Sequence, residues 1–435
     1  SRRRHTRCSR DWSSDVCSSD LGVGDVSVSG SVGRLGGGQT DATSIGIGYA
    51  GSTAVAGLVS GSVTLGYVSK GQVGSGLADA VPVVSGGSVG VSGKVYRLAV
   101  GGVSGTTINL GNVRVGGVVT SGGVSVTNTA ATDGYSDELG MVFGSSNGGF
   151  ELSGDSSSVV AGGSRSLGIG YVGSTVSAGA KSGVLTVGLV SKGQAGTGLA
   201  DVSLAPATLN VSATVYRPAG GGLGSTSVDL GSVREGGSFV SGALSVKNDV
   251  VADAYSEKMN ASIGMVTGNV VAGGAGISLL GAGQTDVTGL SVGLGGTGVA
   301  GLKSGTARVD YVTDGTGTSG LSALGVGSET VSVSGKVYRL AVGSASGSVE
   351  LAPVREGGVF APVKLSVGNV AAGDGYSDDL GVSVVGVGDV SVSGSVGRLG
   401  AGQTDATSIG IGYAGSTAVA GLDRKSTRLN SSHGY

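Results

Sequence analysis

Apolar and polar side chains alternate over short runs along most of the chain. The segments "GVLTVGLVS" (183–191) and "LNVSATVYR" (209–217) have the period of two that is typical of half-buried β-strands. Glycine-rich turn sequences such as "SKGQAGTG" (191–198) separate these runs, and no helical period is found. Between residues 104 and 218 the pattern predicts strands near 107–110, 114–120, 123–129, 140–144, 148–153, 164–171, 183–190 and 208–217.

Several segments recur with a period of about 120 residues, which is the length of one domain rather than one solenoid turn. Seven or eight strands per repeat predict an all-β fold of tandem immunoglobulin-like β-sandwich repeats. A glycine-rich β-helix is the alternative fold, but no sub-period of about 20–30 residues supports it. The recurring segments are "KVYRLAV" (94–100), "TVYRPAG" (214–220) and "KVYRLAV" (336–342); "LGNVRVGG" (110–117), "LGSVREGG" (230–237) and "LAPVREGG" (351–358); and "DGYSDELG" (133–140), "DAYSEKMN" (253–260) and "DGYSDDLG" (374–381).

The phase of the repeat predicts two complete and two partial domains. Residues 104–218 and 222–340 each hold a full set of predicted strands. Residues 22–98 hold only the later strands of a domain, and residues 346–422 hold only the early ones. Both partial domains are therefore expected to expose edge strands and apolar surface that a complete sandwich would cover.

One duplication is much closer than the others. Residues 22–58 return at 386–422 with a single change, from Gly37 to Ala401. Either two neighbouring repeats are nearly identical, or one stretch of DNA was assembled twice.

The two ends of the chain, residues 1–21 and 423–435, differ in composition from everything between them. They hold both cysteines, both histidines, the single tryptophan and eight of the 27 Lys and Arg residues. Codons for most of both ends can be chosen to resemble the two orientations of a short-read sequencing adapter. We therefore interpret both ends as adapter-derived and disordered, and exclude them from fold reasoning. A basic nucleic-acid-binding or membrane-binding arm and a disulfide or metal site at Cys8 and Cys17 are the alternatives.

The composition of residues 22–422 narrows the possible functions. The segment has no Cys, His or Trp, so it lacks the commonest general base, the thiol nucleophile and the main zinc ligands. Without the ends, which hold four of the 29 acidic residues, the net charge is about −6, which does not favour nucleic acid or anionic lipid as a partner. The segment contains no run of about 18 apolar residues, so no membrane-spanning helix is predicted.

Paired carboxylates in the "DGYSDELG" type of loop are candidate calcium ligands or acid–base groups. The middle copy of the loop has Glu257 followed by Lys258, so the pair is not kept within the chain. We therefore interpret the pairs as parts of solvated loops, with a calcium site as the alternative. The pairs are Asp137 with Glu138 and Asp378 with Asp379.

Tyrosine and arginine recur at fixed places in the repeat. Tyr135, Tyr255 and Tyr376 are expected to anchor the acidic loop by burying the ring and bonding the hydroxyl, as a tyrosine corner does. The recurring arginines are expected to form salt bridges between strand ends or neighbouring domains, with recognition of an acidic ligand as the alternative. They are Arg97, Arg217 and Arg339, and Arg114, Arg234 and Arg355.

Two further motifs are interpreted as structural. "GIGYAG" (46–51) and "GIGYVG" (168–173) match the dinucleotide-binding pattern, but no helix signal follows, so they are read as closely packed strands. Serine beside lysine in "KSG" and "SKG" is read as an exposed hairpin loop rather than an activated nucleophile. These segments are 181–183, 303–305, 69–71 and 191–193.

The segments "NLGNVRVGG…VSVTNTAATDGYSDELG" (109–140) and "VSVSGKVYRLA" (331–341) carry a family resemblance. They resemble bacterial choice-of-anchor or autotransporter-like surface repeat proteins with immunoglobulin-like domains of the ASH/Hydin type. The resemblance implies an extracellular or cell-surface location. It also implies a C-terminal anchor, which is not recognised in this sequence.

Together these features predict a non-catalytic stalk segment of a bacterial exported or cell-surface protein. Its expected partners are neighbouring repeats of the same chain, and no catalytic, cofactor-binding or metal-binding residue is predicted. The alternative is an adhesin whose sandwich-end loops bind a glycan or a host protein. Variation between 145–163 and 265–285 favours that alternative, and the lack of exposed aromatic residues argues against it.

Overall fold

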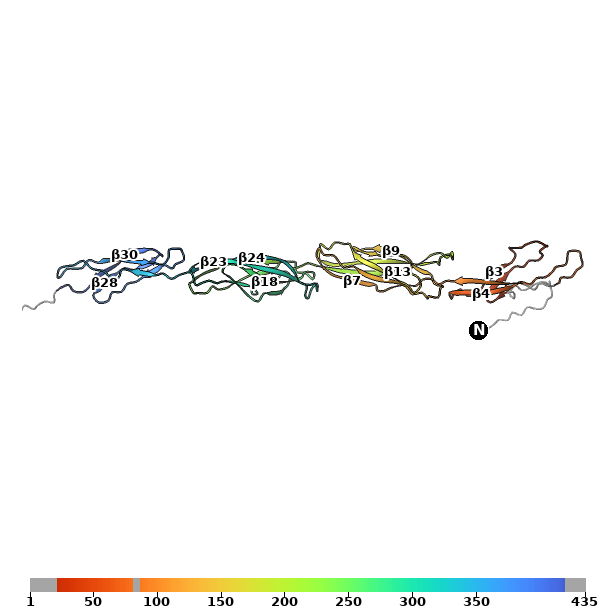
Figure 1. Cartoon of the computed structure of the whole chain (residues 1–435), viewed down its shortest axis with the longest axis horizontal. Coiled ribbons are helices and arrows are strands. Elements are labelled where there is room, and N and C mark those ends of the chain that lie inside the picture. Colours follow the sequence, from red (N-terminus) through yellow and green to blue (C-terminus); the bar gives the residue numbers. More distant parts are fainter. Residues whose placement is uncertain (1–21, 81–86, 419–435) are drawn as a thin grey trace, which may run out of the picture. The chain divides into compact units, whose positions relative to one another are not determined.

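A computed structural model describes residues 22–80 and 87–418, and these ranges contain β-strands and no helix (Figure 1). The all-β prediction is therefore confirmed. No helix of the length and apolarity needed to cross a membrane occurs among the described residues. The two adapter-like ends lie outside them.

The chain divides into two compact units. Unit 1 comprises Ser1–Gly111, Val118–Thr175 and Ala180–Thr214, and unit 2 comprises Asn112–Gly117, Val176–Gly179 and Val215–Tyr435.

Strands β1 to β13 form four sheets, with the strand orders β1-β4-β5, β2-β3, β7-β13-β12-β9 and β10-β11-β8-β6. The strands are β1 (Gly22–Val23), β2 (Val26–Ser29), β3 (Gly46–Tyr49), β4 (Gly57–Thr64), β5 (Ser88–Val95), β6 (Gly101–Val103), β7 (Thr107–Arg114), β8 (Gly122–Asn128), β9 (Glu138–Ser146), β10 (Phe150–Ser153), β11 (Ser164–Tyr171), β12 (Gly179–Lys192) and β13 (Val202–Tyr216).

The two four-stranded sheets face each other as a sandwich. Gly101 on β6 lies so close to the other sheet that a Cβ there would run into Leu189 of β12 and would touch Leu139 of β9. A Cβ at Gly122 on β8 would similarly meet Leu110 of β7. Alternate side chains of both sheets are buried in the core between them, as the period of two predicts.

Strands β14 to β30 include a five-stranded sheet of order β15-β24-β23-β18-β20, which is covered by the sheets β14-β17-β21 and β16-β22-β19. Two smaller sheets, β25-β26-β30-β28 and β27-β29, follow in the chain. The strands are β14 (Gly221–Leu223), β15 (Ser227–Arg234), β16 (Gly242–Ala243), β17 (Val246–Asn248), β18 (Lys258–Val266), β19 (Val270–Gly273), β20 (Ile277–Leu280), β21 (Thr285–Asp286), β22 (Ser291–Leu294), β23 (Gly301–Asp314), β24 (Leu324–Tyr338), β25 (Gly343–Ala345), β26 (Val363–Asn369), β27 (Leu380–Val382), β28 (Val390–Ser393), β29 (Val396–Leu399) and β30 (Thr404–Tyr413).

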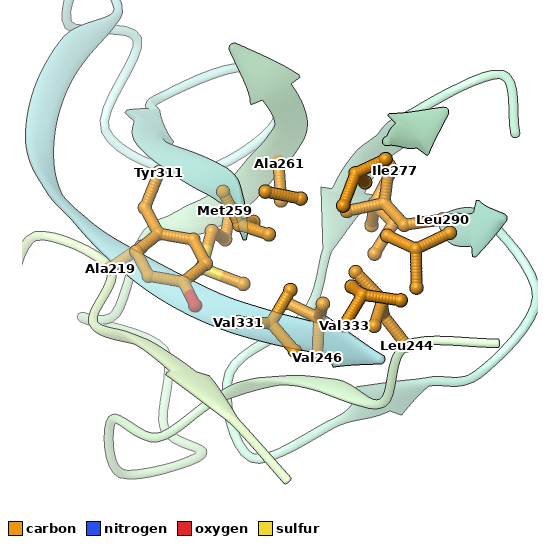
Figure 2. Close-up of a cluster of buried hydrophobic side chains, with 14 of the residues drawn as sticks. Ala219, Leu244, Val246, Met259, Ala261, Ile277, Leu290, Tyr311, Val331 and Val333 are labelled. Atoms are coloured by element: carbon orange, nitrogen blue, oxygen red, sulfur yellow. The ribbon is translucent and has the colours of Figure 1, made fainter. Parts of the chain in front are cut away.

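The core of β14 to β24 shows why this sequence makes a sandwich (Figure 2). Val331 and Val333 of β24 are buried, while Thr330 before them and Ser332 between them are exposed. The buried set packs against Val246 of the covering sheet within one apolar cluster. Burial of such alternating valines supplies the main driving force for folding. Facing, mainly antiparallel sheets of this kind are a tandem immunoglobulin-like sandwich and not a β-helix.

Two local predictions are wrong. The predicted strands 107–110 and 114–120 are one strand, β7, followed by a turn. The turn forms because Gly116 has a positive φ of 79°, and the Gly117 amide donates to the Arg114 carbonyl at 2.9 Å. The "KSG" segments 181–183 and 303–305 are not hairpin loops, because the 14-residue strands β12 and β23 run through them. The "SKG" segment 191–193 is not an exposed loop at its start either, because Ser191 belongs to β12 and is fully buried.

Candidate functional site: the recurring polar junction

The end of each "VYR" segment is clamped to the next acidic loop by the same contacts. The Arg97 amide donates to the Tyr135 carbonyl at 2.9 Å, and the Asp137 amide donates to the Arg97 carbonyl at 3.0 Å. The Arg97 guanidinium donates to Asp133 at 2.8 Å and to the Ser136 hydroxyl at 3.0 Å. The equivalent contacts join Arg217 to Asp253 and Ser256, and Arg339 to Asp374 and Ser377. The predicted salt bridges of these three arginines are therefore confirmed.

The recurring tyrosine anchors the loop differently from the prediction. The ring of Tyr135 is half-buried and tilted against Tyr96, with 6.1 Å between the ring centroids. Tyr255 and Tyr376 pack in the same way on Tyr216 and Tyr338. No hydrogen bond of these three hydroxyls is found within the described residues. The ring contact and the main-chain bonds therefore hold the loop.

A buried asparagine at the end of a strand ties three segments together. The Asn248 amide nitrogen donates to the carbonyls of Glu257 and Leu280 at 3.2 and 3.1 Å, and its oxygen accepts from the Gly220 amide at 3.2 Å. Asn128 and Asn369 make the equivalent bonds. This asparagine was not predicted as a structural residue, although it recurs after "VT", "VK" and "VG" at spacings of 120 and 121.

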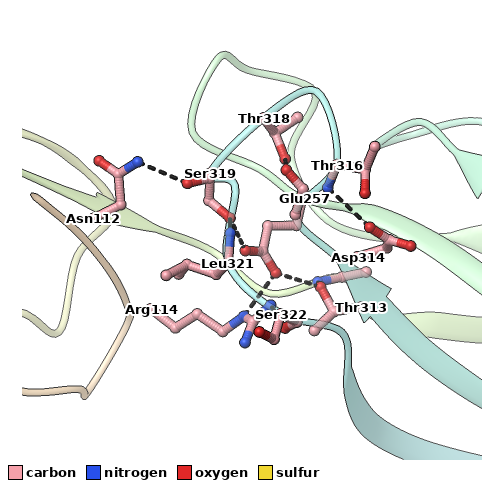
Figure 3. A network of polar contacts seen from close by, with 12 residues as sticks. Asn112, Arg114, Glu257, Thr313, Asp314, Thr316, Thr318, Ser319, Leu321 and Ser322 are labelled. Atoms are coloured by element: carbon pink, nitrogen blue, oxygen red, sulfur yellow. Dashed lines mark hydrogen bonds and ion pairs between the residues drawn. The ribbon is translucent and has the colours of Figure 1, made fainter.

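The acidic residue after the recurring serine is buried in the first two copies, Asp137 and Glu257, and partly buried in the third, Asp378, which corrects the solvated-loop interpretation. Glu257 is fully buried and accepts hydrogen bonds from Arg114 Nε at 2.7 Å, from Thr313 Oγ1 at 2.7 Å and from the Ser319 hydroxyl (Figure 3). These three donors, one of them a guanidinium, offset the free-energy cost of removing the carboxylate from water.

Arg114, which reaches this carboxylate, is the last residue of β7. A terminal guanidinium nitrogen of Arg114 also donates to the Ser322 carbonyl at 2.7 Å. Asn112 Nδ2 donates to the Ser319 carbonyl, also at 2.7 Å (Figure 3). Two side chains of β7 therefore bind the loop between β23 and β24.

The next repeat has the same ion pair in a more open form. Arg234 Nε donates to Asp378 at 2.8 Å, with the arginine side chain 70% exposed. The residue separation is 144, against 143 for Arg114 and Glu257. The predicted salt bridges of Arg114 and Arg234 are therefore confirmed, whereas no described residue pairs with the Arg355 side chain.

The second members of the pairs bind separate neighbours: Glu138 accepts from Ser158, and Asp379 accepts from Arg398. Within residues 22–80 and 87–418 no three His, Cys, Asp or Glu side chains come together.

Lysine and variable loops also have structural roles. Lys70 pairs with Asp79 and Lys192 pairs with Asp201, each at 2.6 Å on the surface. The segment that varies between repeats begins with the same hairpin turn in both copies, in which Phe150 N donates to Asn147 O and Val270 N donates to Thr267 O, each at 3.3 Å. Beyond this turn the copies differ: Ile277–Leu280 forms β20, which pairs with β18, whereas the first copy has an isolated bridge between Leu139 and Val159.

The contacts that clamp the acidic loop to the recurring arginine predict that the stability of the fold depends on pH. The hydrogen bond from Arg339, with that from the Tyr376 amide, holds the pKa of the Asp374 carboxyl below its usual value. A lowered pKa stabilises the folded state at pH values above the usual carboxyl pKa of about 4, and this contribution is lost as pH falls through the lowered pKa. Asp374→Asn should therefore lower the thermal midpoint at pH 7 and lose less further stability below pH 4 than the unmodified chain. Melting curves from pH 2 to 7 measure this; parallel curves for the two proteins would contradict it.

The chain matches no protein-family model and no curated protein. Solved structures with similar features include a protein of unknown function from Porphyromonas gingivalis, with 14% identity, 54% of this chain and 99% of that chain covered, and a TM-score of 0.23. The human Desmocollin-1 ectodomain has 10% identity, coverages of 74% and 57%, and a TM-score of 0.31. The Salmonella enterica SafA pilin in complex with the SafB chaperone has 13% identity, coverages of 54% and 96%, and a TM-score of 0.22. At these TM-scores the fold assignment rests on the sheets described above.

Proposed function

We propose that this chain is a non-catalytic structural segment, of the stalk type, in a bacterial exported or cell-surface protein. In this role each sandwich adds length, and the junction between successive repeats fixes the direction in which the next one continues. The proposal places the chain outside the cell and gives it neighbouring repeats as its partners.

The observation that carries the proposal is the threefold recurrence of the clamp. Arg97, Arg217 and Arg339 each make the same main-chain bonds and the same bonds to an aspartate and a serine. A spacer needs such a joint to be repeated with little change, whereas a binding site needs no such repetition. The charge and composition of residues 22–422 also agree with a role that involves no nucleic acid.

Small-angle X-ray scattering of the 435-residue chain tests the proposal. If each of four sandwiches, two of them partial, adds about 30–40 Å, the radius of gyration should be near 40 Å. A radius of about 22 Å, expected for one compact body of this length, would contradict a spacer.

A further inference from the structure

Two strand pairs in neighbouring repeats are built in the same register. β9 pairs with β12, and its repeat equivalent β18 pairs with β23, the equivalent of β12. Both ladders shift register in the same stretch, at 143–146 and at 263–266. β12 and β23 are both 14 residues long and share the segment "KSG". The main chain would therefore allow β9 to pair with β23, and β18 with β12, an exchange through which proteins of repeated domains commonly misfold.

The charges at one paired position are reversed between the two ladders. Glu138 of β9 lies opposite Lys192 of β12. In the other ladder, Lys258 of β18 lies opposite Asp314 of β23. An exchange would place Glu138 opposite Asp314, and it would place the two lysines opposite each other. Like charges that face each other directly destabilise a strand pair, so the charges favour the native pairing over the exchanged one.

The surroundings of this position differ in step with the charges. In unit 1 the stem of Lys192 lies over Gly140, where a Cβ would be 2.8 Å from Lys192 Cε, and its ammonium binds Asp201 at 2.6 Å. In unit 2 the equivalent of Gly140 is Asn260, whose Nδ2 donates to Asp314 at 2.9 Å. After an exchange, Asn260 would displace the stem of Lys192. Gly140 would offer Asp314 no side-chain donor.

A buried pair on the core face of the same strands differs in size. Met141 lies opposite Leu189 in unit 1, and Ala261 lies opposite Tyr311 in unit 2. All four side chains are buried. An exchange would set Met141 against the Tyr311 ring and would leave Ala261 opposite Leu189. The first pairing would overfill one core and the second would leave space in the other, and both faults destabilise a sandwich.

We propose that the reversed charges at Glu138 and Lys192, and at Lys258 and Asp314, together with the size-matched core pairs, direct each strand to its own sandwich during folding. Neighbouring repeats of similar sequence are thereby kept from exchanging strands. Each native pair is complementary, so reversing the charges of one sandwich preserves its own pairing and removes its difference from the other. This role in folding goes beyond the proposed stalk function and does not depend on it.

Trapping of exchanged strands during refolding tests the proposal. Val142→Cys and Asp310→Cys are introduced into the full chain, with both native cysteines changed to serine. The native ladders place these positions opposite Gly188 and Ser262, so they face each other only when β9 pairs with β23. The chain is diluted from urea in the presence of a short thiol cross-linker, at a concentration low enough to keep the exchange within one molecule. Mass spectrometry measures the cross-linked fraction.

Reversing the charges of unit 1 should raise the cross-linked fraction about tenfold, because both exchanged pairs become oppositely charged. The variant carries Glu138→Lys, Lys192→Asp and Asp201→Ala. The third change removes a carboxylate that would face the new aspartate, and unit 2 has Ala323 at this place. The melting midpoint should change little, because a complementary pair remains in each sandwich.

Reversing the charges of unit 2 instead, with Lys258→Glu and Asp314→Lys, should also raise the cross-linked fraction. Combining both reversals makes the exchanged pairs like-charged again and should return the fraction to that of the unreversed chain, which a mere loss of stability would not do. The matched control is Lys70→Asp with Asp79→Lys, which reverses an exposed ion pair outside the two ladders and should have no effect. An unchanged fraction after either single reversal, or a high fraction when both are reversed, would overturn the proposal.

Discussion

Replacing Arg114 with methionine should lower the free energy of unfolding of unit 2 by about 3 kcal/mol, because it leaves a buried carboxylate without its counter-charge. Glu257 is fully buried, and the arginine side chain is 18% exposed, so water replaces little of the lost interaction. The hydroxyls of Thr313 and Ser319 remain as donors and keep the loss from being larger. Hydrogen exchange of the backbone amides around Glu257, measured peptide by peptide, reports this change within unit 2.

The equivalent substitution in the next repeat is the matched control. Arg234→Met removes the same type of ion pair, but from an exposed arginine, so it should cost less than about 1 kcal/mol. Equal losses for Arg114→Met and Arg234→Met would show that burial of Glu257 does not matter and would contradict the account.

Replacing Asn248 with alanine should cost about 4 kcal/mol, because several buried polar groups lose their partners together. The carbonyls of Glu257 and Leu280 lose their donor, and the Gly220 amide loses its acceptor. The segments that these groups belong to should then exchange their amide hydrogens faster. The exchange rates of peptides covering 218–224 and 278–284 measure the effect.

An exposed asparagine provides the comparison for this substitution. Asn109 accepts one hydrogen bond, from the Gly111 amide, and lies on the surface. Asn109→Ala should change the free energy of unfolding by less than about 1 kcal/mol. A similar small change for Asn248→Ala would mean that the buried amide is not a structural link.

The strands and their repetition could be read from the sequence because both depend on local alternation and on similarity between distant segments. The strand β11 begins and ends as predicted, at 164 and 171. The division of β7 was wrong because its C-terminal end is defined by a glycine turn, whose sequence looks like a continuing strand.

The burial of Glu257 could not be predicted from the sequence, because the residues that surround it lie far away along the chain. Glu257 is bonded by Arg114, 143 residues earlier, and by Thr313 and Ser319, 56 and 62 residues later, and a carboxylate in a loop otherwise suggests exposure. The duplicated segment makes the same point: Leu399 is buried, whereas Leu35, in the same sequence context, is half exposed. Burial depends on the strands that neighbour a segment, so identical sequences can have different surroundings.

Spin-label distances across one junction test the central claim that the clamp is a fixed joint. Labels at the exposed positions Val299 and Val387 lie on either side of Arg339 within unit 2, and Cys8 and Cys17 are first replaced by serine. The account predicts one narrow distance distribution, which broadens when Arg339 is replaced by alanine. A broad distribution in the unmodified junction, unchanged by Arg339→Ala, would contradict it.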